Sequence, residues 1–252
     1  MDHNLKATVR YDGTGFAGWQ VQPNARTIQG EIEGALSRIA SQPVRIQGAG
    51  RTDAGVHALG QVFSCSWPKE PDTARLVRSL SSMLSPEIRI ESIEVAPPEF
   101  NARYDAKSKR YAYAISLARE PDPFSARCAW CVPWRLDIAR LGQLAQSLAG
   151  EHDFAGFQCS GSDIHTTVRT LYSVEVLPGG IVGPCDAENL YRIEFWGDGF
   201  LYKMVRNITG TLVDIVRGVV PEERLQETLR SPGPFHGHTA PAHGLVLMEV
   251  RY

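Results

Sequence analysis

The sequence lacks a hydrophobic run long enough to cross a membrane. Of its 252 residues, 43% are hydrophobic and 21% are charged, proportions typical of a soluble globular protein. No apolar stretch approaches the roughly 20 residues that a spanning helix needs. The segment from Met1 to Lys6 is polar and lacks the apolar core of a signal peptide. We therefore expect a cytoplasmic protein, long enough for one large domain or two smaller ones.

Cysteine is also scarce, and its placement argues against a disulfide framework. Cys128 and Cys131 have the C-x-x-C spacing of half a zinc site or of a redox pair. The second C-x-x-C or the H-x3-H that would complete a zinc set is missing. Pro133 follows too closely for the helix that a thioredoxin-type pair would open. Ordinary thiols and no metal are expected for all five positions: Cys65, Cys128, Cys131, Cys159 and Cys185.

An excess of positive charge is missing as well. The net charge is −2 and the isoelectric point is about 6.4. This balance counts against a protein that coats nucleic acid indiscriminately. It leaves room for RNA binding through local clusters of cations, because attraction to phosphate depends on where the charges lie.

The first half of the chain predicts the element order β-α-β-β-α-β. One helix is expected after Thr27, a suitable N-cap, and a second over about 72–84, capped by Asp72. Apolar residues recur at helical spacing in both segments. This order is that of the split β-α-β, or ferredoxin-like, pattern. The expected strands lie near 5–11, 44–47, 60–67 and 88–95.

The second half predicts the same order, so two related α+β halves are expected, 1–105 and 106–252. The Pro/Gly/His-rich segment 231–244 is interpreted as a long loop, and loops of that length are often functional. The expected strands lie near 110–117, 168–177, 190–196 and 245–251. The expected helices lie near 137–149, 201–217 and 221–230, the last opening with Pro221 at a favoured position.

The segment 47–61, QGAGRTDAGVHALGQ, places a carboxylate and a guanidinium among closely spaced glycines. Glycines let a backbone turn tightly and approach a ligand. The segment lacks the lysine of a P-loop and the glycine spacing of a dinucleotide-binding turn. Two interpretations remain at this point. The segment is a hairpin loop with a structural pair of Arg51 and Asp53, or Asp53 is a nucleophile or base kept ionised by a guanidinium.

The run GAGRTDAGVHA (48–58), followed by GQV (60–62), resembles the signature of the TruA family of tRNA pseudouridine synthases. One departure is Ser81 and Ser82, which stand where the family commonly has an asparagine. Further motifs match in the same order, so the resemblance covers nearly the whole chain: YDGTGFAGWQ (11–20), FNAR (100–103), KRYAY (109–113), HDF (152–154), GFLYKMVRNITG (199–210) and HGLVL (243–247).

The resemblance implies a pseudouridine synthase fold. In that fold, two ferredoxin-like halves are joined around a central, mostly antiparallel sheet, with a cleft between them. It also implies isomerisation of uridine to pseudouridine in the tRNA anticodon stem-loop, at positions 38, 39 and 40, by a homodimer. The reaction breaks the bond between ribose C1′ and uracil N1 and rejoins the base through C5. Nothing is oxidised and no group is added, so no cofactor is expected.

By resemblance, Asp53 is the catalytic carboxylate. It could attack a ribose or base carbon, or remove a ribose proton, and the sequence does not choose among these routes. The target uracil must leave the RNA stack to reach it.

Four further residues are assigned to the substrate by resemblance. Tyr111 is implied to stack on the uracil, and its hydroxyl could take the C5 proton, whereas Tyr113 fits a packing role better. Arg51 and Arg206 are expected near the aspartate, with Arg206 as its better direct partner. Leu245 matches a position that packs against the base.

Contacts to the RNA backbone are expected from local cations, the densest group being 103–110. Two alternatives are a non-catalytic RNA-binding module and a hydrolase of N-glycosidic bonds, which would release free uracil. The combination of Asp53 with the other matched residues argues against the first. The candidate backbone cations are Arg10, Arg103, Lys107, Lys109, Arg110, Arg169 and Lys203.

Overall fold

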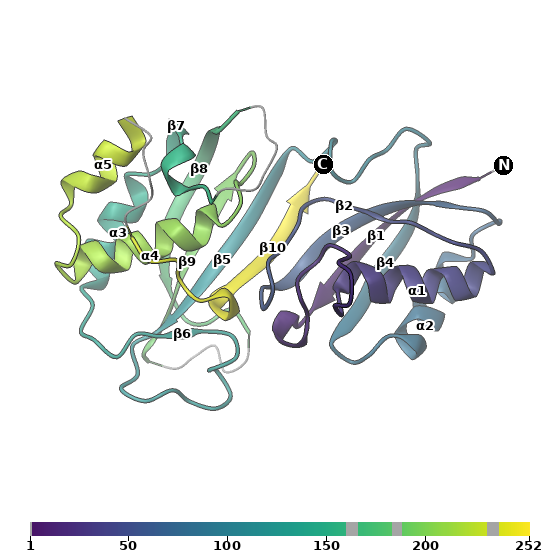
Figure 1. The fold of residues 1–252 in the computed structure, drawn as a ribbon, viewed down its shortest axis with the longest axis horizontal. Helices are drawn as coiled ribbons and strands as arrows, with labels where there is room; N and C mark the ends of the chain where they lie inside the picture. The colour runs from purple at the N-terminus through teal and green to yellow at the C-terminus, as the bar shows by residue number, and fades with distance from the viewer. Residues whose placement is uncertain (1, 160–165, 183–187, 231–236) are drawn as a thin grey trace. The chain divides into compact units, whose positions relative to one another are not determined.

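The chain divides into two compact units, each built on its own group of strands (Figure 1). The first unit comprises residues 1–107 together with 247–252, and the second comprises 108–246. The computed structural model describes residues 2–159, 166–182, 188–230 and 237–252.

In the first unit, an antiparallel sheet is centred on β1 (His3–Tyr11) and β3 (His57–Trp67). β1 pairs with β3 on one side and with β4 (Ile88–Ala96) on the other. The short β2 (Gln47–Gly48) pairs with β3. β10 (Leu245–Arg251) follows β3 in the strand order. Alternate residues of β1 are buried, as expected for a strand with one face against a core.

The last residues of the described chain are bonded into this first unit. The Lys107 amide donates to the Arg251 carbonyl at 2.8 Å, and the Tyr252 hydroxyl donates to the Ala102 carbonyl at 2.8 Å. At Gly60 in β3, an added Cβ would lie 2.5 Å from the Met248 carbonyl oxygen. The strand β10 therefore lies against β3 so closely that this position requires glycine.

Two helices of the first unit, α1 (Ile28–Ala40) and α2 (Thr73–Met83), lie side by side, and α2 packs along β4 (Figure 1). The Thr27 hydroxyl accepts the Gly30 amide at 3.2 Å. The Asp72 carboxylate accepts the Arg75 amide at 2.9 Å. Both predicted N-caps are thus confirmed.

In the second unit, four strands form an antiparallel series. β5 (Ser108–Ser116) pairs with β9 (Leu190–Gly197), β9 with β8 (Val168–Pro178), and β8 with β7 (Gly150–Asp153). The two-residue β6 (Trp130–Cys131) runs parallel to β5. The sequence did not predict β6 or β7, because strands this short give no readable alternation.

The helices of the second unit are α3 (Ile138–Gln146), α4 (Met204–Val216) and α5 (Glu223–Arg230). α3 packs on β8 and on α4. α4 is buried over most of its length. Short 3-10 turns occur at Gly13–Gly15 (η1), Ala155–Phe157 (η2) and Ala242–Gly244 (η3).

The α+β class and the predicted order of the main elements are confirmed, with two differences. The expected strand 44–47 is wrong over most of its length, because side chains of α1 take its backbone amides. The Val44 amide donates to the Ser37 hydroxyl at 2.9 Å and the Ile46 amide to Glu33 at 3.0 Å. The helix expected from 201 begins at Met204, because Lys203 has a left-handed φ of 59°.

No disulfide involves the four described cysteines, Cys65, Cys128, Cys131 and Cys159. Burial raises the pKa of Cys65 to about 12, and the Cys131 thiol donates to the Ala118 carbonyl at 3.3 Å. Cys185 lies outside the described residues. Across the described ranges, no cluster of three or more His, Cys, Asp or Glu side chains is placed to hold a metal ion. Among these same residues, no helix is long and apolar enough to cross a membrane.

The Asp72 cap gives a direct test of the local structure. Asp72→Ala should lower the free energy of unfolding by about 1 kcal/mol, because the Arg75 amide loses its acceptor. Asp72→Asn keeps an oxygen acceptor and should change stability little. Urea denaturation of the three proteins measures both effects. Equal losses for alanine and asparagine would contradict the capping role.

Candidate active site

The loop between β2 and β3, residues 49–56, carries Asp53 and is called the Asp53 loop here. The Asp53 side chain is half-buried. Its carbonyl accepts the Val56 amide at 3.1 Å, which closes a tight turn. Gly55 within this turn has a φ of +79°, a conformation that favours glycine.

The two residues on either side of Arg51, Gly50 and Thr52, are hydrogen-bonded to residues outside the loop. The buried Thr52 shares a 2.8 Å hydrogen bond between its hydroxyl and that of Tyr11, and its carbonyl accepts the Trp19 amide at 3.0 Å. The Gly50 carbonyl accepts a hydrogen bond from the side-chain amide of Gln61 at 2.8 Å. These bonds tie the loop to β1, to the segment after it, and to β3. The backbone at the aspartate is therefore held in one place.

Tyr11 is a buried neutral group under this loop. Burial raises the pKa of Tyr11 well above its usual value, although hydrogen bonds with Thr52 and Gln61 act in the opposite direction. The hydroxyl consequently stays protonated at neutral pH. The neutral hydroxyl keeps its hydrogen bond to Thr52 and adds no charge near the aspartate.

The segment 11–20 lies directly on the Asp53 loop at two of its glycines. Gly18 has a φ of +92°, and an added Cβ there would lie 2.7 Å from the Thr52 carbonyl oxygen and 3.1 Å from the Asp53 carbonyl carbon. At Gly13, an added Cβ would lie 2.0 Å from the Val56 carbonyl oxygen. Two motifs far apart in the sequence thus form one packed backbone structure.

His57 completes this contact from the start of β3. Its buried ring accepts the Gly13 amide through Nδ1 at 3.1 Å. Sequence reasoning did not single out this histidine, nor Tyr11, Trp19 and Gln61. The only available signal was their membership of the motifs 11–20 and 48–62.

Arg51 is exposed on the Asp53 loop. The interpretation of this loop as a structural Arg51–Asp53 pair stays a prediction.

Tyr111 and Tyr113 lie two residues apart on β5 and have different surroundings. The ring of Tyr111 makes an edge-to-face contact with Phe200, with ring centres 5.0 Å apart. Tyr113 is fully buried, and its hydroxyl donates to the Pro241 carbonyl at 2.7 Å. Burial raises the pKa of Tyr113, while the nearby charge of Arg206 opposes the shift. Tyr113 is a packing residue, as the sequence suggested.

Arg206 lies in the first turn of α4, and Leu245 begins β10. The Arg206 Nε donates to the Ala240 carbonyl at 2.8 Å, and the Ala240 amide donates back to the Arg206 carbonyl at 3.1 Å. Leu245 is buried. Arg206, Leu245 and Tyr111 belong to the second unit, whereas Asp53 and Arg51 belong to the first.

Two of the predicted backbone cations are paired with carboxylates. Arg10 Nε lies 2.9 Å from Glu91, and Arg110 forms an ion pair with Glu194. Glu194 also accepts Arg192 Nε at 2.7 Å. Burial opposes ionisation of Glu194, but hydrogen bonds from the two arginines hold its pKa below the usual value. The positive charge of Arg10 and Arg110 is thus partly cancelled.

Two other predicted cations lie beside exposed tyrosine rings. Arg103 lies 5.6 Å from the ring centre of Tyr104, which is 76% exposed. Lys203 lies 5.2 Å from the ring centre of Tyr202, which is 41% exposed. A cation next to an aromatic face is a combination that single-stranded RNA segments can stack on and pair with.

The remaining three cations are Lys107, Lys109 and Arg169. Lys107 is exposed, and Lys109 is half-buried. The Arg169 guanidinium donates to the Thr166 carbonyl at 2.9 Å and lies close to Gly199, where an added Cβ would be 3.2 Å from its Nε.

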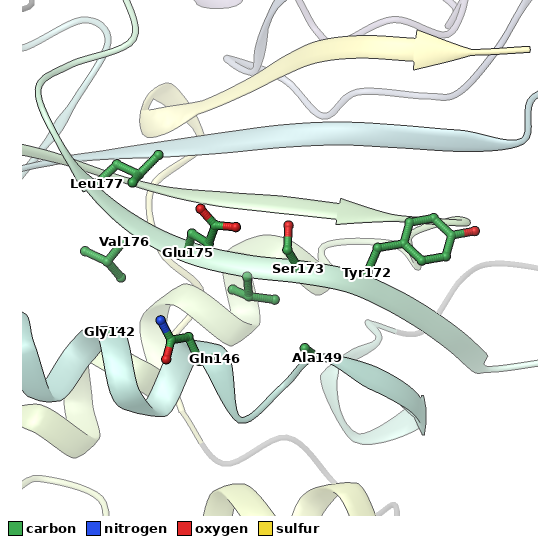
Figure 2. Close-up of a pocket in the computed structure, with 9 residues that line it drawn as sticks. Gly142, Gln146, Ala149, Tyr172, Ser173, Glu175, Val176 and Leu177 are labelled. Atoms are coloured by element: carbon green, nitrogen blue, oxygen red, sulfur yellow. The ribbon is translucent and has the colours of Figure 1, made fainter.

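A pocket of about 310 Å³ lies between α3 and β8 (Figure 2). It is lined by Gly142, Gln146 and Ala149 on one side and by residues 172–177 of β8 on the other. None of the predicted site residues lines it. The candidate site is therefore defined by the chemistry of its side chains rather than by this hollow.

Comparison with known proteins gives a consistent match over the whole chain. A family model described as tRNA pseudouridine synthase matches residues 7–105 and 144–252. The tRNA pseudouridine synthase A of Streptococcus thermophilus CNRZ 1066 is 42% identical over 249 residues, which cover 98% of each chain. The enzyme of the same name from Lacticaseibacillus casei BL23 is 39% identical over 255 residues and 100% of each chain.

A more distant relative and a solved structure extend the comparison. The tRNA pseudouridine synthase A of Geobacter sulfurreducens is 37% identical over 98% of this chain and 99% of its own. A chain in a crystal structure of a Cbf5-Nop10-Gar1 complex matches with a TM-score of 0.38 and 11% identity, covering 96% of this chain and 48% of that one. That similarity is too distant to add to the match with the sequence relatives.

The contact at Gly18 predicts a stability effect. Gly18→Ala should lower the free energy of unfolding by about 1–3 kcal/mol, because the backbone is left-handed and the new methyl group meets the Asp53 loop. Gly34→Ala in α1 is the matched control, since an added Cβ there has no atom within 4 Å. That change should raise stability by about 0.5–1 kcal/mol. Thermal and urea unfolding measure both, and a stable Gly18→Ala protein would contradict the close approach.

Proposed function

The chain belongs to the tRNA pseudouridine synthase family, and we propose that it isomerises uridine in the anticodon stem-loop, at positions 38, 39 and 40, with Asp53 as its catalytic carboxylate. The activity of the family is the conversion of uridine to pseudouridine in tRNA. The observation that carries the role of Asp53 is the immobilised backbone of its loop. A reacting carboxylate must be held close to one position, since small displacements cost much of the rate.

The support for Asp53 is geometric and chemical. Its loop is fixed through Thr52 and Gly50 on one side and by its own turn to Val56 on the other. The neutral Tyr11 beneath the loop contributes a hydrogen bond without a charge. Asp53 then attacks a ribose or base carbon, or removes a ribose proton, and the bond between ribose C1′ and uracil N1 breaks. The base turns and rejoins C1′ through C5; C5 loses its proton and N1 gains one, so the reaction is a net isomerisation.

In this proposal Tyr111 holds the flipped uracil and accepts the proton from C5. Its contact with Phe200 fixes the ring as a stacking surface. Leu245 packs against the other side of the base. Arg206 pairs with Asp53, and Arg51 contacts the substrate from the exposed side of the Asp53 loop.

The RNA backbone is held by the predicted cations, which divide into two groups. Arg103 and Lys203 offer a charge beside an exposed ring, and Lys107, Lys109 and Arg169 offer charge alone. Arg10 and Arg110 exchange a carboxylate for a phosphate when RNA binds, so their net contribution is smaller. We assign the Asp53 loop to a half spanning 1–105, and Tyr111, Arg206 and Leu245 to a half spanning 106–252.

We further propose that the enzyme acts in the cytoplasm as a homodimer, together with tRNA and without a cofactor. A chain with a net charge of −2 needs spaced cationic patches to bind RNA, and spaced patches recognise shape. In a dimer, one subunit can hold the body of the tRNA while its partner presents Asp53 to the anticodon arm. Shape recognition accounts for modification at several neighbouring positions.

Asp53→Asn tests the central assignment. It should abolish pseudouridine formation and leave tRNA affinity within about twofold of wild type, because phosphate contacts dominate binding. Release of tritium from tRNA labelled at uracil C5 measures turnover, and filter binding measures affinity. Asp72→Asn is the matched control and should stay fully active. Substantial turnover in Asp53→Asn would refute the role, and free uracil from wild type would identify a glycosidic hydrolase.

Tyr111→Phe keeps the ring and removes only the hydroxyl. Turnover should fall by about 10²-fold or more, because the acceptor of the C5 proton is lost, while tRNA affinity stays near wild type. Tyr111→Ala should weaken both. Tyr191→Phe, which removes a hydroxyl from a half-buried tyrosine on β9, is the control. If Tyr111→Phe turns over at the wild-type rate, the hydroxyl takes no proton and the ring serves only for stacking.

A further inference from the structure

Residues 238–241, called the strap here, form an irregular segment fastened to the second unit at every residue. His238 Nδ1 lies 2.7 Å from the Asp214 carboxylate. The Thr239 hydroxyl donates to the Asn207 side-chain oxygen at 2.7 Å. Ala240 exchanges bonds with Arg206, and the Pro241 carbonyl accepts the Tyr113 hydroxyl at 2.7 Å. Three of these four anchors belong to α4 and the fourth to β5.

The strap lies directly on the surface of α4. An added Cβ at Gly210 would lie 1.8 Å from the His238 carbonyl oxygen and 3.2 Å from the Ala240 amide nitrogen. No side chain fits between the helix and the strap at this point. The position of the strap backbone is therefore determined by the helix to within an atomic diameter.

The anchoring side chains on α4 are themselves fixed. Asn207 is 0% exposed, and its amide nitrogen donates to the Phe157 carbonyl at 2.8 Å. Asp214 is buried and lies 3.5 Å from Arg217. The His238 ring contacts Trp130 edge-to-face, with ring centres 5.1 Å apart. A buried polar group without its partner is costly, so these anchors keep the strap in a single place.

The strap in turn holds the guanidinium of Arg206. A guanidinium is planar, with its donors in a fixed fork. Once Nε donates to the Ala240 carbonyl, the directions of the two terminal nitrogens follow from the position of that carbonyl. A shift of the Ala240 carbonyl by a fraction of an ångström would change the directions in which both terminal nitrogens of Arg206 donate.

We propose that Thr239 and His238, through Asn207 and Asp214, are positioning residues that set the orientation of the Arg206 guanidinium for the reaction. This inference rests on the proposed function, in which Arg206 pairs with Asp53. Neither Thr239 nor His238 touches the substrate. Their effect reaches the reaction only through the Ala240 carbonyl, so losing either anchor slows the chemical step and spares RNA binding.

The first test compares Thr239→Val with Thr239→Ser. The valine keeps the shape and loses the hydroxyl, whereas the serine keeps the hydroxyl. Thr239→Val should lower kcat by about tenfold, as expected when an oriented group is misplaced, with tRNA affinity within about twofold of wild type. Thr239→Ser should restore most of kcat. Thr228→Val is the control, because that hydroxyl donates to the Arg224 carbonyl on α5 and should leave kcat unchanged.

The second test observes Arg206 itself. In ¹⁵N NMR spectra, the Nε–H signal of Arg206, assigned by its loss in Arg206→Lys, should exchange slowly with water in wild type and in Thr239→Ser. It should exchange rapidly in Thr239→Val and in His238→Leu, which removes the other anchor. This measurement needs no turnover, so it remains decisive for a variant too impaired to assay.

The outcomes separate the inference from the proposed function. An inactive wild type or an active Asp53→Asn would refute the function. If wild type is active and Thr239→Val matches it in kcat and in Nε–H exchange, the strap does not position Arg206. If both strap variants lose kcat and tRNA affinity together, with melting temperatures far below that of Thr228→Val, the strap only supports the fold, and the inference is equally overturned.

Discussion

The contact between the segment 11–20 and the Asp53 loop is the constraint on which the candidate site depends. Gly18 and Gly13 bring backbone against backbone at distances that exclude any side chain. Tyr11 then reaches Thr52, and the Trp19 amide reaches the Thr52 carbonyl. A glycine-rich loop would otherwise sample many backbone conformations. Restricting it to a single conformation costs conformational entropy. The fixed bonds suppress these conformations in the folded chain, so the backbone at Asp53 is already ordered.

In the second unit, irregular backbone is also held in one conformation, but mainly by side-chain hydrogen bonds. Its irregular strap is held by polar side chains that project from α4 and β5, and at Gly210 the strap backbone lies too close to the helix for any side chain. In the first unit Asp53 and Arg51 lie on irregular backbone, whereas in the second unit Tyr111, Arg206 and Leu245 lie on regular elements. The helix α4 is central because Asn207 bonds to both the strap and the Phe157 carbonyl. The buried side-chain amide of Asn207 thereby joins the strap and the turn at Phe157 to the helical turn that carries Arg206.

The elements with local signals could be predicted from the sequence, whereas their tertiary bonds could not. Thr27 and Asp72 cap helices because a side chain meets an amide three residues away, and that pattern is visible in the chain. The segment 44–47 was misjudged because its amides bond to Glu33 and Ser37 of another element. The pairing of Arg10 with Glu91, and of Arg110 with Glu194, likewise depends on strand register. The motif points to Asp53 as a candidate, whereas the bonds of Tyr11 and Gln61 to its loop depend on the pairing of β1 with β3.

The grouping of residues 247–252 with 1–107 has a consequence for synthesis on the ribosome. The strands β1, β3 and β4 emerge early, yet the strand that continues their sheet, β10, is translated only after the whole of 108–246. The edge of β3 that will receive β10 is therefore open while the second unit is being made. Open strand edges favour association with other nascent chains. The first unit thus needs either protection by chaperones or rapid elongation, and slow translation of 108–246 should raise aggregation more than slow translation of 1–107.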